Sequence, residues 1–195
     1  MIMTLGVVRM NACMEQKHYH IISPFENGGY HESIKLDNVS LIDTTSLSDD
    51  LHIINVTSDT LEKTKSHTAY MLALDYANKG YKTLFLDMDL RKTKSSSWVK
   101  EKSCVDVFAI IKEGIPVEDV CYKEVPNLDI ICSENIHTGI TEFLISRAFK
   151  QFIYGLKNTY DKILIDAPSL LHHKEALILR DYACGTIIVH DRLKR

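Results

Sequence analysis

The chain has 195 residues, of which 45% are hydrophobic and 25% charged, and its formal net charge is -3. This length and composition suit one globular domain and exclude strong electrostatic attraction to nucleic acid or anionic lipid. The five cysteines are odd in number and form no C-x-x-C pair, which argues against a disulfide framework or a cysteine zinc site. Because the chain shows no secretory signal and no apolar run long enough to cross a bilayer, we expect a cytoplasmic protein without direct membrane insertion, whose association with a membrane would go through a partner.

The first 30 residues contain Pro24 and the pair Gly28 and Gly29, and they show no sustained hydrophobic period. We therefore expect an irregular N-terminal arm over residues 1–30 and a single α/β domain over residues 31–195. Within that domain, a helix is predicted over roughly 31–42, followed by a polar linker at 43–50.

Short apolar runs alternate with helix-length segments through the rest of the chain. Buried strands are predicted at 51–58, 82–86, 128–132, 162–165 and 186–189. Helices are predicted at 66–79, 105–112, 141–158 and 175–182, and the third is the clearest because its apolar residues follow the helical period over several turns. The alternation predicts an α/β fold: a doubly wound, mostly parallel sheet with helices on both faces. Ligands of such sheets bind at the carboxyl ends of the strands.

A phosphate-binding loop is predicted after the first of these strands, where the chain reads DTLEKTKSHT and then becomes helical. In the strand, loop, Lys-Ser and helix arrangement, backbone N–H groups and the helix N-terminus surround phosphate. The lysine reaches the outer phosphate oxygens and the hydroxyl binds Mg²⁺, which makes Lys65 and Ser66 the candidates for these two roles.

Acidic residues follow two further strands. One strand runs into Asp87-Met88-Asp89, and strand alternation places the two carboxylates on the same side. A later strand ends at Asp166, in the position of a Walker B aspartate. Carboxylates in this arrangement suit a hydrated Mg²⁺ or the removal of a proton from a hydroxyl. Together with the Lys-Ser pair they predict a Mg-nucleotide site.

The segments LFLDMDLRK, VPNLDIICS, YDKILIDAP and YACGTIIVH follow the Lys-Ser run in an order and at intervals that resemble the bacterial tyrosine kinases of capsule and exopolysaccharide synthesis, which are P-loop NTPase-like proteins. Asp87-x-Asp89-x-Arg91 matches the Walker A′ motif, the most distinctive element of that family. The resemblance implies Mg²⁺ and ATP or ADP as cofactors. It assigns catalytic roles to Asp87, Asp89 and Lys65, cofactor binding to Thr64, Lys65, Ser66, His67 and Asp166, and metal binding to Ser66, Asp87 and Asp166.

The phosphate loop departs from the family pattern Gly-x-Gly-Lys-Ser-Thr, because Glu62 and Thr64 stand at the two glycine positions. A β-branched threonine fits poorly where the backbone must visit positive φ. The charge of Glu62 would repel phosphate by roughly 4 kcal/mol at about 4 Å and an effective dielectric of about 20. In addition, Lys35 and Asn38 replace two arginines of the family's ring-assembly motif, and no tyrosine follows Tyr182. We expect impaired ATP binding and phosphotransfer.

The function expected from these residues is that of a tyrosine-kinase-like protein in capsule or exopolysaccharide biosynthesis or its regulation, with the character of a pseudokinase. One alternative is an active Mg-ATP-dependent protein-tyrosine kinase. Another is a partitioning ATPase of the ParA/MinD type, although the signature lysine of that class is matched only by the displaced Lys63. The implied partners are a membrane modulator resembling a polysaccharide chain-length regulator, and further copies of the chain or an active paralogue. No nucleic-acid partner is expected.

Overall fold

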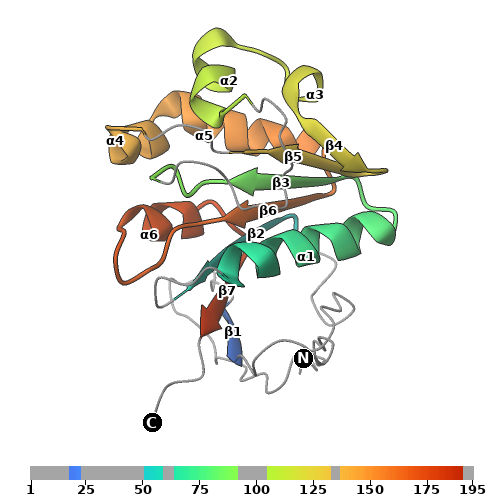
Figure 1. The fold of residues 1–195 in the computed structure, drawn as a ribbon. Coiled ribbons are helices and arrows are strands. Elements are labelled where there is room, and N and C mark those ends of the chain that lie inside the picture. Colours follow the sequence, from blue (N-terminus) through green and yellow to red (C-terminus); the bar gives the residue numbers. More distant parts are fainter. Residues whose placement is uncertain (1–17, 23–50, 59–63, 92–104, 133–136, 191–195) are drawn as a thin grey trace.

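The computed structural model describes residues 18–22, 51–58, 64–91, 105–132 and 137–190 (Figure 1). Its strands are β1 (His18–Ile22), β2 (Ile53–Ser58), β3 (Thr83–Asp87), β4 (Tyr122–Val125), β5 (Leu128–Ile131), β6 (Lys162–Asp166) and β7 (Gly185–His190). Its helices are α1 (Thr64–Asn78), α2 (Val107–Glu113), α3 (Val117–Val120), α4 (Ile140–Ile145), α5 (Arg147–Gly155), the 3-10 helix η2 (Leu156–Asn158) and α6 (Glu175–Arg180). No helix in the described part of the chain has the length and apolarity needed to span a bilayer.

The seven strands form one sheet in the order β1-β7-β2-β6-β3-β5-β4. The five central strands run parallel, and the edge strands β1 and β4 pair antiparallel with β7 and β5. Every residue of β2, β3, β5 and β6 is buried, as expected for strands covered on both faces. The predicted mostly parallel sheet is therefore confirmed.

Helices cover both faces of this sheet. On one face, Ile54 and Val56 of β2 share a buried cluster with Leu72 of α1. On the other face, Ile53 shares a second cluster with Phe149 of α5 and with residues of α2, α3, α4 and α6. Neighbouring residues of β2 thus point to opposite faces, as strand alternation requires. Figure 1 shows α1 on one side of the sheet and α4 and α5 on the other, so the doubly wound fold is confirmed.

The helix predicted as continuous over 141–158 is in fact divided at Ser146. This residue has an extended backbone (φ -65°, ψ 152°), and its hydroxyl accepts a hydrogen bond from the Phe149 N–H at 3.1 Å. Serine is a favoured N-cap because its oxygen satisfies an N–H group that has no partner within the helix. The apolar period continues across the break, which explains why the sequence pattern did not show it.

Three short elements were not predicted from the sequence: β1, α3 and β4. Strand β1 lies within the segment expected to be irregular, and it pairs with β7 from His18 opposite His190 to Ile22 opposite Thr186. An edge strand of this kind depends on hydrogen bonds to a distant segment, which a local pattern does not reveal. Strand β4 forms a tight hairpin with β5, with Asn127 at φ 66° in the turn. The helix predicted over 31–42 lies outside the described residues.

Candidate functional site

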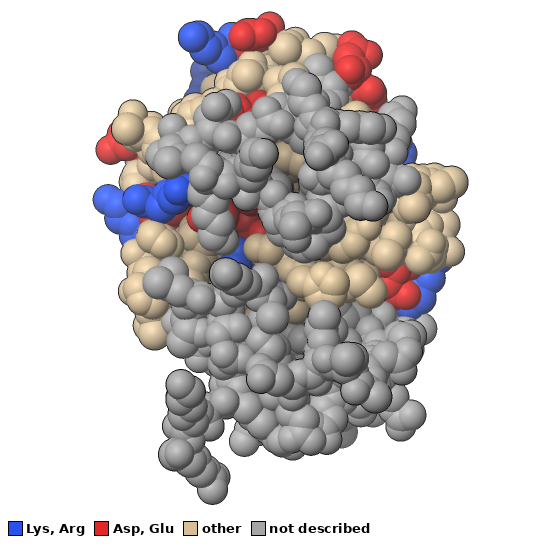
Figure 2. Space-filling view, viewed as in Figure 1, with Lys and Arg blue, Asp and Glu red and all other residues tan. Residues whose placement is uncertain are grey.

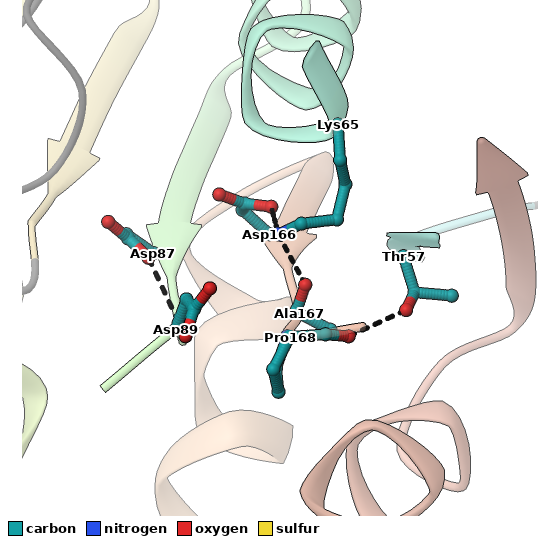
Figure 3. A network of polar contacts seen from close by, with 7 residues as sticks. All are labelled: Thr57, Lys65, Asp87, Asp89, Asp166, Ala167 and Pro168. Carbon is teal, nitrogen blue, oxygen red and sulfur yellow. Dashed lines mark hydrogen bonds and ion pairs between the residues drawn. The ribbon is translucent and has the colours of Figure 1, made fainter. Parts of the chain in front are cut away.

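The carboxyl ends of β2, β6 and β3 bring the predicted site residues together (Figure 3). Asp87 ends β3 and Asp166 ends β6, and the two residues are directly opposite each other in the parallel register. Lys65 lies in the first turn of α1, which follows β2. Three segments that are far apart in the sequence therefore supply one lysine and two carboxylates at one edge of the sheet, as predicted.

Lys65 is held in a buried ion pair. Its ammonium group donates hydrogen bonds to Oδ1 of Asp166 and to the carbonyl oxygen of Ala167. The side chains of Lys65 and Asp166 are each only 2% exposed. A buried charge requires a partner of opposite charge, and here each ion supplies that partner for the other.

The two aspartates of the Walker A′ motif lie beside this pair. Oδ1 of Asp87 accepts a hydrogen bond from the backbone N–H of Asp89 at 3.0 Å, and both residues are buried. The N–H of Met88 donates to the carbonyl oxygen of Asp166 at 3.0 Å, which joins the end of β3 to β6. Figure 3 shows the carboxylates of Asp87 and Asp89 on the same end of the strand, next to Asp166.

The segment after β6 is fixed to the end of β2. The hydroxyl of Thr57 donates to the carbonyl oxygen of Pro168 at 2.7 Å, and the Leu170 N–H donates to the carbonyl oxygen of Ser58 at 2.8 Å. Because Asp166 and Ala167 lie directly before this segment, their acceptor atoms are held in place for Lys65.

Glu175, for which no role is predicted from the sequence, lies at the start of α6. Its Oε1 accepts hydrogen bonds from the Arg91 guanidinium at 2.5 Å and from the Thr141 hydroxyl at 3.0 Å. Burial alone would raise the pKa of Glu175, but hydrogen bonds from its own backbone N–H, Thr141 and Arg91 hold that pKa below the ordinary value. Only Arg91 belongs to a recognisable motif, so no sequence signal points to its buried partner.

The remaining predicted ligands lie at the start of α1. Ser66 is buried and His67 is half-buried, and burial lowers the pKa of the His67 imidazole, which favours its neutral form. Thr64 is the first residue of α1, while Glu62 and Lys63 lie outside the described residues. Among the described residues, no three His, Cys, Asp or Glu side chains form a group that could hold a metal ion.

The chemistry of the donor set fits a Mg-nucleotide. Proteins bind Mg²⁺ through one or two carboxylates, with phosphate oxygens and water as the other ligands. Asp87 and Asp166 provide carboxylates, Ser66 provides a hydroxyl and Lys65 provides a cation for phosphate, all at one edge of the sheet. The arrangement can therefore hold a phosphate group and a divalent cation, provided that Lys65 leaves Asp166.

Comparisons with known proteins agree with this fold. Residues 52–191 match the family described as AAA domain. The chain is 29% identical to the tyrosine-protein kinase YwqD of Bacillus subtilis over 76% of this chain and 63% of YwqD. It is 31% identical to the tyrosine-protein kinase CpsD of Streptococcus agalactiae serotype III over 73% of this chain and 63% of CpsD.

A solved structure shares the fold as well. The crystal structure of the VpsO kinase domain superimposes with a TM-score of 0.65 at 27% identity, over 72% of this chain and 70% of that domain. The chain spans about 63% of the length of the curated relatives named above. The chain therefore belongs to the AAA domain family, and the curated relatives that it matches are bacterial tyrosine-protein kinases.

Proposed function

We propose that the chain is a tyrosine-kinase-like P-loop protein of capsule or exopolysaccharide biosynthesis in which ATP binding and phosphotransfer are impaired. The relatives named as tyrosine-protein kinases support the first part of this proposal. The second part depends on one observation: Lys65 is buried and already neutralised by Asp166, directly after a loop that lacks both glycines.

Each residue of the site has a role in this proposal. Lys65 would bind the outer phosphate oxygens, and Ser66, Asp87 and Asp166 would hold Mg²⁺, with Thr64 and His67 flanking the phosphates. Asp89 would lie near the acceptor tyrosine and favour loss of its hydroxyl proton. Bound Mg-ATP would supply the transferable phosphoryl group.

Nucleotide binding has to compete with the Lys65–Asp166 ion pair. Breaking a buried ion pair costs about 3 to 5 kcal/mol when nothing replaces the lost partner, so binding requires that phosphate takes the place of Asp166 beside Lys65 and that Mg²⁺ compensates Asp166. Each 1.4 kcal/mol weakens binding about tenfold. An ordinary phosphate loop offsets this cost with backbone N–H groups that approach phosphate closely at glycines. Glu62 and Thr64 replace those glycines here, so we expect weak binding.

Calorimetric titration with Mg-ATP and Mg-ADP tests the proposal, with Lys65→Ala as the control. We expect no detectable heat at high nucleotide concentration for either protein. Micromolar binding that is lost in Lys65→Ala would instead favour an active enzyme. Phosphotyrosine detection after incubation with ATP then separates a kinase from an ATPase of the ParA/MinD type, which would hydrolyse ATP without forming phosphotyrosine.

A protein with this impairment would act through binding. We propose that it works in the cytoplasm and docks on a membrane modulator resembling a polysaccharide chain-length regulator, on an active paralogue or on further copies of itself. Adding the chain to an active kinase of the family together with its modulator should change the rate of phosphotyrosine formation. An unchanged rate, with no complex detected by size-exclusion chromatography, would contradict this role.

A further inference from the structure

Glu175 joins three segments at the edge of the site. It begins α6, and it binds Arg91, two residues after Asp89, and Thr141 in the first turn of α4. The residue is 2% exposed, whereas the side chain of Arg91 is 45% exposed. On the left side of the view, where Figure 1 places α4 and α6, Figure 2 shows basic and acidic atoms next to each other on the surface. A buried carboxylate thus anchors a half-exposed arginine.

Fold stability does not explain this carboxylate. Its second oxygen, Oε2, is buried and has no hydrogen-bond partner among the residues that the structure describes. Leaving a buried polar atom unsatisfied costs about 1 to 3 kcal/mol, and well-packed apolar residues often stabilise a fold as much as a buried ion pair does. An apolar side chain at position 175 would avoid that cost, which points to a role in the site.

Arg91 follows Asp87 and Asp89 in the segment that leaves β3. Leu90 of this segment accepts a hydrogen bond at its carbonyl oxygen from the His137 N–H, at 3.1 Å. The ion pair of Arg91, the next residue, with Glu175 adds a connection from this segment to α6. The position of Asp89, beyond the end of β3, depends on such connections because the strand ladder no longer fixes it.

We propose that Glu175 is a positioning residue that acts through Arg91 and holds Asp89 in place beside Asp87. This inference deepens the proposed function, because it concerns an aspartate of the same site. It does not depend on nucleotide binding, since the contacts are present without a ligand.

Amide hydrogen exchange of the nucleotide-free protein tests the inference, with Glu175→Gln as the variant. The Asp89 N–H bonds to Asp87 and the His137 N–H bonds to Leu90, so both report on the segment. We expect both amides to exchange about tenfold faster or more in the variant, because weakening the contact with Arg91 lowers the free energy of local opening of this segment. Local opening can change in this way without a change in global unfolding. The amides of Ala167 and Leu170, which bond to β2, should keep their wild-type rates.

Three further variants separate positioning from a merely structural effect. Glu142→Gln, which changes an exposed glutamate in the first turn of α4, is the matched control and should change none of these rates. Glu175→Asp keeps the carboxylate and should restore slow exchange. Because Glu175 acts through Arg91, the double variant R91Q/E175Q should exchange no faster than R91Q alone.

Two results would overturn the inference. The first is wild-type exchange at Asp89 and His137 in Glu175→Gln, and the second is equal acceleration at all four amides, which would indicate global destabilisation. If Glu175→Gln folds poorly, Glu175→Met takes its place, and the same two outcomes apply. Since no nucleotide is added, a failure here is distinct from a failure of the proposed function.

Discussion

Two buried lysines, one near the carboxyl ends and one at the amino ends of the central strands, have different surroundings. Lys65 lies at the carboxyl edge and is paired with the carboxylate of Asp166. Lys162 begins β6 at the amino edge and is 1% exposed. Its ammonium group donates to the carbonyl oxygen of Leu51 at 3.1 Å and lies 5.1 Å from the ring centres of Tyr76 and Tyr81.

The difference shows how burial alone fails to identify a functional lysine. The ammonium of Lys65 is balanced by an anion, so phosphate could replace that anion while Mg²⁺ compensates Asp166. Among the described residues, Lys162 contacts a carbonyl dipole and two aromatic faces, which stabilise a fixed cation within the fold. We therefore propose ligand binding for Lys65 and packing for Lys162.

The largest expected effect comes from Lys65→Met. The substitution leaves the carboxylate of Asp166 buried without its cation, and we expect a loss of about 3 to 5 kcal/mol in the free energy of unfolding. Urea denaturation of the nucleotide-free protein measures it. The double variant K65M/D166N should cost less than the sum of the two single variants. Additive costs would show that the two side chains are not coupled.

Lys162→Met sharpens the comparison from the other side. Among the contacts with described residues, the variant loses the hydrogen bond to Leu51 and the contacts with two aromatic rings, for which we expect a cost of about 1 to 2 kcal/mol. Urea denaturation under the same conditions as for Lys65→Met measures this cost. A cost as large as that of Lys65→Met would contradict the division between a ligand-binding and a packing lysine.

Tyr160→Phe tests a second buried side chain near the amino end of β6. The Tyr160 hydroxyl donates to Oδ2 of Asp129 at 2.8 Å, and its removal should cost about 1 kcal/mol at neutral pH. Burial, followed by the neighbouring Asp129, raises the pKa of Tyr160 far above its usual value of about 10. Its contribution to stability is therefore complete below pH about 10 and is lost as the pH rises further. Denaturation curves above pH 10 should show less alkaline destabilisation in the variant than in the wild type.

The smallest expected effect concerns Glu175 and acid. Because the folded-state pKa of Glu175 is lowered, its ionised form contributes stability above the ordinary glutamate pKa. This contribution is lost as the pH falls through the folded-state pKa. Between pH 6 and pH 3, the melting temperature should fall slightly more steeply for the wild type than for Glu175→Gln. Parallel curves for the two proteins would show that Glu175 does not contribute in this way.

The sequence predicted the central strands and the meeting of Lys65, Asp87 and Asp166. Apolar runs of strand length and the order of the motifs were sufficient, because parallel strands place their carboxyl ends at one edge. The sequence did not reveal the break at Ser146, because the apolar period is the same on both sides of it. It did not reveal the proposed role of Glu175 either, because that role depends on contacts with Thr141 of α4 and with Arg91, beyond the end of β3, that only the folded chain brings together.

The central claim is that nucleotide binding is impaired because Glu62 and Thr64 stand at the two glycine positions of the family pattern. A variant with glycine at both positions tests this claim most directly. Calorimetric titration should compare Mg-ATP binding by the wild type, by E62G/T64G, and by E62G/T64G with Lys65→Ala added. We predict no detectable binding by the wild type, micromolar binding by E62G/T64G, and loss of that binding when Lys65 is removed. Micromolar binding by the wild type that the two glycines do not strengthen would contradict the account.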